Sequence, residues 1–191
     1  MSKITPCFTP GTRIATDRGW RPVENLRRGD RVVTRDNGLK RIAWAGRRDV
    51  TYADLAEIPE LQPVLVRRGA FGQGMPDRDM LVSPMHRFLV MPEGRNGEEC
   101  LCAARLLTFR DGIEMAPVLG VSYLHILLEA HEVILADGIW TESFHPDDAT
   151  LNGMDAHTRD EILALFPEIE TLGAVRRFPA ARDILQSRFE R

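Results

Sequence analysis

This sequence of 191 residues has few cysteines, little excess of charge of either sign, and no long apolar run. The three cysteines cannot all pair within one chain, so no disulfide framework is expected. The formal net charge of -3 provides no basic surface for nucleic-acid phosphates, and no nucleic-acid partner is predicted. No stretch approaches the roughly 18 apolar residues of a spanning helix, and Met1 to Pro6 has no apolar signal segment. We therefore expect no membrane association and a cytoplasmic location.

The composition is that of an ordinary globular protein, with 43% hydrophobic and 28% charged residues. The chain is long enough to bury one sizeable core, and it contains no repeat or low-complexity tract that indicates a solenoid or a disordered linker. We expect one main domain over residues 7–146, a short upstream segment at 1–6, and a helical extension at 147–191. The oligomeric state is left open.

The first half of the chain consists of short β-type runs separated by turn residues, which is typical of a meander of hairpins. Asn37-Gly38 is a strong turn signal, because both residues tolerate the positive φ angles of a type I′ hairpin turn. The glycine-rich loop at 69–74 is expected to be exposed and mobile. The expected strands are 13–16, 31–34, 41–44, 63–66, 81–82 and 87–90.

The middle of the chain is expected to contain one short helix and a further pair of strands. The helix is predicted over 101–108, and the strands over 121–128 and 132–135. Asp137-Gly138 follows the second of these strands as a turn.

The character of the sequence changes after Pro146. Thr158 and Glu161 have capping-box spacing ahead of apolar residues, which predicts a short amphipathic helix that ends at Pro167. The pattern as a whole predicts an all-β domain with a short C-terminal helical extension.

Cys7 begins the most distinctive motif, Cys-Phe-Thr-Pro-Gly-Thr, which continues into 23–26 and 29–32. This motif resembles the first block of Hedgehog/intein (Hint) domains, and their bacterial branch in particular. The resemblance implies a horseshoe of short hairpins in which the Cys7 thiol attacks the carbonyl of Pro6, where proximity replaces a bimolecular encounter. A free cysteine alone is more often a small buried hydrophobic residue, so the surrounding motif is what favours a nucleophile.

Ser83 and His86 form a second motif, in which a hydroxyl residue precedes a histidine by three positions. It is similar to the second block of the same family. The resemblance implies that His86 hydrogen-bonds the scissile amide nitrogen and protonates it, while Ser83 holds the peptide or its developing oxyanion. An imidazole with an unperturbed pKa of about 6.5 suits such acid work. Taken alone, the four residues from Ser83 to His86 are more simply explained as an ordinary turn followed by a histidine at the end of a strand.

His131 lies in a third motif, residues 122–140, which resembles the late strand pair of Hint domains. The family often carries a polar catalytic helper at this place, which makes His131 a candidate. On an alternating strand, His125 shares a face with Tyr123 and Leu127, so it is equally consistent with packing in the core. His131 therefore ranks above His125.

The residues after Gly138 differ from those of splicing members of the family, in which a histidine-asparagine pair cuts the second junction. Here Thr141 and Glu142 take that place, and a glutamate lacks the amide nitrogen that forms the cyclic imide. The resemblance therefore implies a Hedgehog-like half-reaction: an N-to-S acyl shift at Cys7, then thioester cleavage by water or a small nucleophile. The substrate is the chain's own segment Met1 to Pro6, whose prolyl acyl group is hindered, and no cofactor is required.

Three alternatives compete with self-processing. A zinc site is disfavoured because Cys100 and Cys102 are separated by one residue, whereas a zinc knuckle needs two to four. A protease acting on other proteins needs a cleft and an orienting Asn or Asp, which the sequence alone does not locate. The main alternative is a catalytically inert Hint-fold module with a binding or structural role, since the upstream segment is short.

Overall fold

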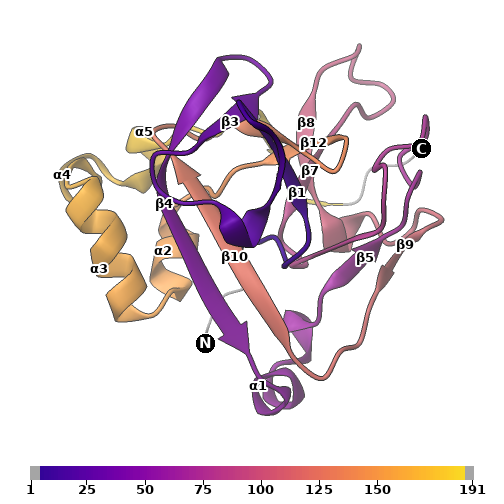
Figure 1. Ribbon diagram of the computed structural model, residues 1–191, viewed down its shortest axis with the longest axis horizontal. Helices are drawn as coiled ribbons and strands as arrows, with labels where there is room; N and C mark the ends of the chain where they lie inside the picture. Colours follow the sequence, from indigo (N-terminus) through magenta and orange to yellow (C-terminus); the bar gives the residue numbers. More distant parts are fainter. Residues whose placement is uncertain (1–4, 188–191) are drawn as a thin grey trace.

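The computed structural model of the protein describes residues 5–187, and these are mostly β-strands (Figure 1). Of the upstream segment, Thr5 and Pro6 are described, whereas residues 1–4 and the last residues of the extension, 188–191, lie outside the described part. The strands are β1 (Arg13–Thr16), β2 (Gly19–Pro22), β3 (Arg31–Thr34), β4 (Gly38–Val50), β5 (Val64–Val66), β6 (Met80–Val82), β7 (Arg87–Val90), β8 (Cys100–Ala103), β9 (Ile113–Met115), β10 (Val121–Leu128), β11 (Val133–Ala136), β12 (Ile139–Glu142) and β13 (Asp183–Leu185).

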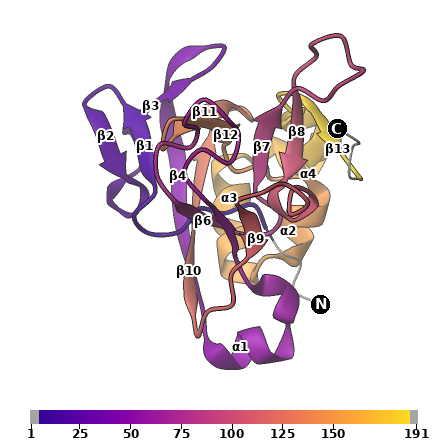
Figure 2. The same cartoon turned by 90° about the vertical axis from the view of Figure 1, so that its right-hand side faces the viewer.

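The strands form two sheets. A 10-stranded sheet has the order β10-β4-β3-β1-β11-β12-β7-β8-β13, with β2 paired to β1, and a 3-stranded sheet has the order β6-β5-β9. In Figure 2 the hairpins of β1 to β3 and the hairpin of β7 and β8 lie on opposite sides of the molecule. The expected all-β architecture with a helical C-terminal extension is confirmed.

The longest pairing joins β4 to β10, with Val50 opposite Val121 and Trp44 opposite Leu127. This ribbon crosses the whole molecule in Figure 1. Its strands belong to chain segments about 80 residues apart, so the pairing is a non-local contact that no turn motif announces.

The helices of the extension lie against this ribbon (Figure 1). Aromatic and aliphatic side chains from both partners form one buried cluster, in which Trp44, Leu127 and Phe144 meet Leu151, Ile162, Phe166, Ile169 and Phe178. These helices are α2 (Asp148–Gly153), α3 (Ala156–Leu165), α4 (Glu168–Leu172) and α5 (Ala174–Arg177), while α1 (Tyr52–Glu57) follows β4.

The expected helix is present as α3, but it begins before Thr158 and buries only Ile162 fully. Asp155 is the N-cap, and its carboxylate accepts a hydrogen bond from the Thr158 backbone N–H at 2.9 Å. The capping residue is therefore three positions earlier than the spacing of Thr158 and Glu161 suggested. Its end at Leu165, before Pro167, agrees with the prediction.

The helix predicted over 101–108 was wrong. Residues Cys100–Ala103 form β8, and only Ala104–Leu106 make a short 3-10 turn. All four residues of β8 are buried between β7 and β13, so a fully buried strand without alternation mimicked an apolar helix in sequence.

Both strands predicted around 121–128 and 132–135 are present, but they do not pair with each other. β10 pairs with β4, whereas β11 pairs with β1, β3 and β12. Asp137 and Gly138 do form the tight turn between β11 and β12, with φ of 43° and 79°.

The Asn37-Gly38 signal correctly locates the hairpin between β3 and β4, but not its turn type. Thr34 pairs with Gly38, so three residues form the loop, and of this pair only Gly38 has a positive φ (66°). The loop at 69–74 is closed by backbone hydrogen bonds from Gly69 to Pro76 and from Phe71 to Met75. Its Phe71 packs on the core, so it is anchored rather than fully exposed.

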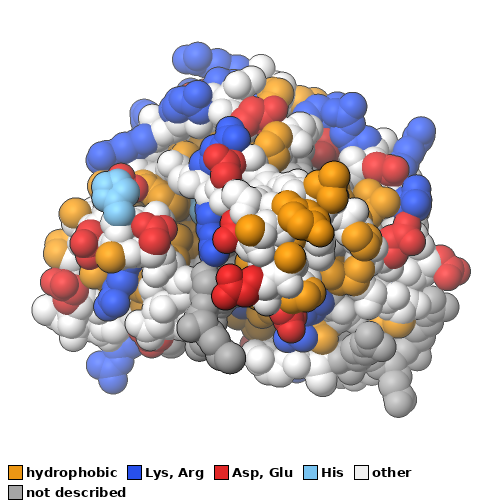
Figure 3. Space-filling model, turned by 90° about the horizontal axis from the view of Figure 1, so that it is seen from below, with side chains coloured by type: hydrophobic (Ala, Val, Ile, Leu, Met, Phe, Trp, Pro, Cys, Tyr) orange, Lys and Arg blue, Asp and Glu red, His pale blue; other side chains and the backbone are white. Residues whose placement is uncertain are grey.

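Apolar surface gathers at the end of the molecule where α1 lies, as Figure 3 shows from below. Tyr52 of α1 is 64% exposed, and Leu119, just before the start of β10, is 80% exposed. In the described part of the chain, no helix has the length and apolarity to cross a membrane.

Candidate active site

The backbone around Cys7 is held from both sides. Phe8 forms β-bridges to Val82 and to Leu124, and exchanges two backbone hydrogen bonds of 2.9 Å with Leu124. On the other side, the N–H of Ser83 donates to the Cys7 carbonyl at 3.0 Å. Strands β6 and β10 thus fix Cys7 in the interior, where its residue is 2% exposed.

The hydroxyl of Ser83 spans the Pro6–Cys7 peptide bond. Its Oγ accepts the Cys7 N–H at 2.9 Å and donates its proton to the Thr5 carbonyl at 2.7 Å. Ser83 is completely buried, so no solvent competes for these bonds. The side chain therefore holds residues on both sides of the bond in register.

The Cys7 thiol rests as a neutral donor. Its Sγ lies 3.0 Å from the Thr5 carbonyl and 3.2 Å from the Thr5 hydroxyl. Burial raises the pKa of Cys7 to about 12, although hydrogen bonds from Thr5 and Ser83 oppose the rise. A group must therefore remove the proton during the reaction, because the resting thiol does not ionise near neutral pH.

The ring of His125 is the imidazole that contacts this peptide. Nδ1 lies 3.2 Å from the Pro6 carbonyl oxygen, and the two ring nitrogens are 3.6 and 3.7 Å from Cys7 Sγ. Trp44 stacks at 6.0 Å and Phe144 meets the ring edge-on at 4.9 Å, which fixes its orientation. Burial lowers the pKa of His125 to about 4, so the ring is neutral at neutral pH.

His86 lies next to this peptide without a hydrogen bond to it. Its ring packs on Phe8 at 4.4 Å and its Nε2 meets the hydroxyl of Thr141. Burial lowers its pKa to about 4. The resemblance implied His86 at the Cys7 nitrogen, whereas the structure has the Ser83 hydroxyl there.

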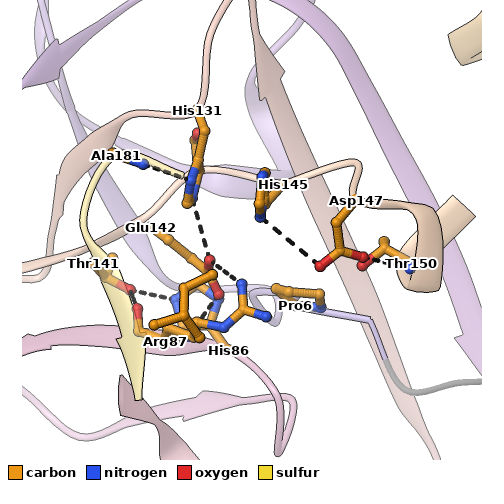
Figure 4. Close-up of polar contacts among 12 residues, drawn as sticks. Pro6, His86, Arg87, His131, Thr141, Glu142, His145, Asp147, Thr150 and Ala181 are labelled. Atoms are coloured by element: carbon orange, nitrogen blue, oxygen red, sulfur yellow. Dashed lines mark hydrogen bonds and ion pairs between the residues drawn. The ribbon is translucent and has the colours of Figure 1, made fainter. Parts of the chain in front are cut away.

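His131 belongs to a neighbouring buried cluster (Figure 4). Its Nε2 is 3.3 Å from the Glu142 carboxylate, its Nδ1 accepts the Ala181 N–H at 3.1 Å, and its ring stacks on His145 at 4.2 Å. The structure therefore brings Cys7 and Ser83 together with His125. It places His131 beside Glu142 and the extension.

Glu142 is the fully buried anion of this cluster. Its carboxylate accepts both the backbone N–H and the guanidinium of Arg87, each at 2.8 Å. Burial acts to raise the pKa of Glu142, but Arg87 and His131 outweigh it and hold the pKa below its usual value.

Two residues with contacts in this site, His125 and Thr141, were not among the candidates chosen from the sequence. The strand alternation correctly put His125 on a face with Tyr123, and Tyr123 packs in the same cluster as Cys7, but the sequence did not say what that face meets. Thr141 was noted only as a departure from a splicing pair. In both cases the missing information was the non-local pairing of strands.

A cavity of about 590 Å³ opens beside Pro6. Met85, Arg87 and Asp147 line it, as does Ile184 of the extension. Within residues 5–187, no three His, Cys, Asp or Glu side chains are grouped so that they could hold a metal ion.

Comparisons with known proteins show which family and which solved structures the chain is similar to. The family described as the Hint domain matches residues 6–148. No curated protein sequence matches the chain.

Solved structures of similar fold include an intein-like domain from Clostridium thermocellum. It is 15% identical, with a TM-score of 0.48, over 74% of this chain and 99% of that one. The gp41-1 intein is 11% identical, with a TM-score of 0.43, over 71% and 97%. A DnaB intein from Synechocystis sp. PCC 6803 is 9% identical, with a TM-score of 0.43, over 72% and 98%.

Proposed function

The chain belongs to the Hint domain family, and from that premise we propose that it cleaves its own backbone before Cys7. The reaction is an N-to-S acyl shift from the Cys7 nitrogen to its sulfur, followed by thioester cleavage without splicing. The substrate is the segment that ends at Pro6.

The observation that carries this proposal is the position of His125. One buried ring lies within 3.2 Å of the Pro6 carbonyl oxygen and within 3.7 Å of the Cys7 sulfur. These are the two atoms whose charge changes in an attack of sulfur on the carbonyl carbon.

The first step follows from that placement. With a proton on Nδ1, His125 donates to the Pro6 oxygen, and Nε2 keeps its lone pair. Sγ lies 3.6 and 3.7 Å from the two ring nitrogens, so it must shift toward that lone pair to deliver its proton there. As the S–C bond forms, the thiol proton moves to Nε2, and the carbonyl electron pair becomes an oxyanion that Nδ1–H stabilises. Burial lowers the pKa of His125 to about 4, so the ring is neutral before the reaction and has one nitrogen free to accept a proton.

In the second step the C–N bond breaks and the Cys7 nitrogen gains a proton. Ser83 holds this nitrogen at 2.9 Å, and the His86 ring lies one residue away, on Phe8. We assign the proton to the small protonated fraction of His86, while His125 returns its own proton to solvent. The pKa of His86, about 4, keeps that fraction small at neutral pH, so cleavage should be slow.

The thioester is then opened by water or a small nucleophile. The cavity beside Pro6 supports this step, since it lies next to the acyl residue. The absence of splicing is supported by Glu142, whose carboxylate is held by Arg87 and cannot form the cyclic imide that an asparagine makes.

An inert Hint-fold module is the second candidate, and the burial of the thiol favours it. A cysteine whose pKa is raised to about 12 is a poor nucleophile in its resting state. The two functions differ in whether the Pro6–Cys7 bond ever breaks.

Intact mass spectrometry distinguishes them. Freshly purified protein is incubated at neutral pH with a reducing thiol and hydroxylamine, alongside Cys7→Ala and Cys102→Ala. Cys102 is the matched control, because it is also a buried thiol and burial raises its pKa to about 11.

Self-processing predicts loss of the residues before Cys7 from the unsubstituted and Cys102→Ala proteins, and none from Cys7→Ala. Unchanged masses in all three proteins over days would reject the acyl shift and leave the inert module.

A further inference from the structure

The hydroxyl of Thr141 sits between two partners of different kinds. Its Oγ1 is 2.7 Å from the Arg87 carbonyl oxygen and 2.5 Å from Nε2 of His86. Thr141 is completely buried, so water does not share these contacts.

The single proton of a hydroxyl decides which partner donates. A carbonyl oxygen can only accept, so the Thr141 proton goes to Arg87. The hydroxyl oxygen must then accept from His86, which requires a proton on Nε2. In a neutral imidazole the other nitrogen, Nδ1, then carries a lone pair and no proton.

Nδ1 of His86 has no hydrogen-bond partner within the described part of the chain, although it is buried. Its ring is enclosed by the aromatic rings of Phe8 and Phe88, at 4.4 and 5.6 Å between centroids. An unpartnered lone pair in the interior is costly, and such atoms in native structures call for a reason.

Glu142, the residue after Thr141, holds the neighbouring part of the chain. Glu142 accepts from the backbone N–H and the guanidinium of Arg87, the residue that follows His86. Two consecutive residues of β12 therefore hold His86, which precedes β7, and Arg87, the first residue of β7.

We propose that Thr141 is a positioning residue that fixes the tautomer of His86, with its proton on Nε2 and with Nδ1 reserved for proton exchange. The second part rests on the proposed function, in which His86 protonates the Cys7 nitrogen. The nitrogen that receives and then delivers that proton is Nδ1, because Thr141 occupies Nε2. Thr141 and Glu142, which stand where splicing members carry histidine and asparagine, would thus support His86 in the cleavage before Cys7.

The tautomer is tested independently of activity. Nitrogen-15 NMR of the imidazoles is recorded at pH 7 on Cys7→Ala, in which no acyl shift occurs. We expect the His86 signals of a proton on Nε2 and an unprotonated Nδ1. Adding Thr141→Val should give a mixture of tautomers or move the proton to Nδ1, whereas adding Thr141→Ser should leave the spectrum unchanged.

A matched control is Thr34→Val, which removes another buried threonine hydroxyl whose proton goes to a carbonyl, that of Gly38, at 2.7 Å. It should not alter the His86 signals. A proton on Nδ1 in the protein with Thr141 intact would overturn the assignment, even if the Thr141→Val protein failed to fold. An unchanged His86 spectrum in a folded Thr141→Val protein would overturn it as well.

The cleavage arm uses proteins that retain Cys7. Thr141→Val should slow cleavage by about 10-fold or more, and Thr141→Ser by less than about 3-fold, because general acid catalysis depends on the correct tautomer. Equal rates in the two variants would contradict the role of Nδ1. If no protein cleaves while the NMR pattern is as expected, the acyl shift fails and the tautomer assignment stands.

Discussion

At the scale of single residues, His125 and His131 have different environments, and this difference predicts different mutational effects. His125→Asn removes the ring that contacts both the Pro6 oxygen and the Cys7 sulfur. We expect thioester formation to slow by about 100-fold, the usual size of a general-base contribution. The rate is measured by trapping with hydroxylamine and mass spectrometry.

His131→Gln is the comparison, since its ring meets Glu142 and Ala181 instead. Its effect should be mainly on the free energy of unfolding, with cleavage slowed by less than about 10-fold. A larger loss of cleavage in His131→Gln than in His125→Asn would restore the ranking expected from sequence.

Ser83 predicts a second effect. Ser83→Ala leaves the Cys7 N–H without its buried partner, which costs about 1–3 kcal/mol, and leaves the Thr5 carbonyl with the Cys7 thiol as its donor. Cleavage should also slow by about 10- to 100-fold because the scissile peptide is no longer held. Ser83→Thr retains the hydroxyl and should recover most of both losses, measured by urea unfolding and cleavage rate. A Ser83→Ala protein as stable and as active as the unsubstituted protein would exclude a role for the hydroxyl.

The buried histidines also make stability depend on pH. Burial lowers the folded-state pKa of His86 and His125 from 6.5 to about 4. Above pH 6.5 the two histidines are neutral in both the folded and the unfolded protein. As the pH falls from about 6.5 to about 4, they bind protons in the unfolded protein but not in the folded one. Each residue should then cost roughly 3 kcal/mol of stability.

Urea unfolding between pH 7.5 and 4 measures this loss. His125→Gln should remove roughly 3 kcal/mol of the pH-dependent decrease. His157→Gln is the control, because the side chain of His157 is 86% exposed. Equal pH profiles for His125→Gln and the unsubstituted protein would show that His125 is protonated alike in both states.

At the scale of elements, Gly46 connects β4 to the candidate site. A Cβ at Gly46 would lie 2.0 Å from the Trp44 ring, which hydrogen-bonds Glu161 and stacks on His125. Gly46→Ala must displace that ring, and overpacking of this kind costs about 1–3 kcal/mol. Gly120→Ala, whose Cβ would meet only the Val50 carbonyl at 3.4 Å, should cost less.

Fluorescence-monitored unfolding and the cleavage rate together test this prediction. Because Trp44 orients His125, Gly46→Ala should also lower the cleavage rate, whereas Gly120→Ala should not. A stable, fully active Gly46→Ala protein would mean that Trp44 does not position His125.

The same scale explains which elements were predictable from sequence. The hairpin at Asn37-Gly38 and the turn at Asp137-Gly138 were located correctly because their signals are local, but β12, the strand after the second turn, was not predicted. β8 was mistaken for a helix because burial on both faces removes the alternation that identifies a strand. The partners of β10 and β11 were not predictable, since nothing local specifies which distant strand completes a pair.

The residues of the candidate site divide in the same way. Cys7, Ser83 and His86 belong to short motifs, so the sequence alone identified them as candidates. His125 comes to Cys7 only through the bridge between Phe8 and Leu124, and Thr141 comes to His86 only through the pairing of β12 with β7. Such contacts depend on sheet order, which one sequence does not contain.

At the scale of the whole molecule, the extension is part of one fold with the main domain. The family match ends at residue 148, where α2 begins, yet the helices beyond it bury Trp44, Leu127 and Phe144. β13 pairs in parallel with β8 and so completes the edge of the large sheet. Removal of the extension would therefore expose a core cluster rather than detach an independent unit.

Phe178 provides the test of this cooperativity. It is completely buried, meets Phe166 edge-on at 5.0 Å, and its carbonyl accepts a hydrogen bond from His145 at 2.8 Å. Phe178→Ala should destabilise the protein by about 3–5 kcal/mol, as expected for a large buried aromatic side chain. Leu172→Ala, at a residue that is 51% exposed, should change stability by less than about 1 kcal/mol.

Cooperative unfolding also predicts how these losses are distributed. Near-ultraviolet and far-ultraviolet circular dichroism should give the same urea midpoint, and Phe178→Ala should lower both equally, because the extension and the β4–β10 ribbon share one buried cluster. Two separated transitions, with only the weaker one shifted by Phe178→Ala, would show that the extension unfolds by itself. In that case the contacts of Ala181 with His131 and of Phe178 with His145 would be lost without unfolding the strands that hold Cys7.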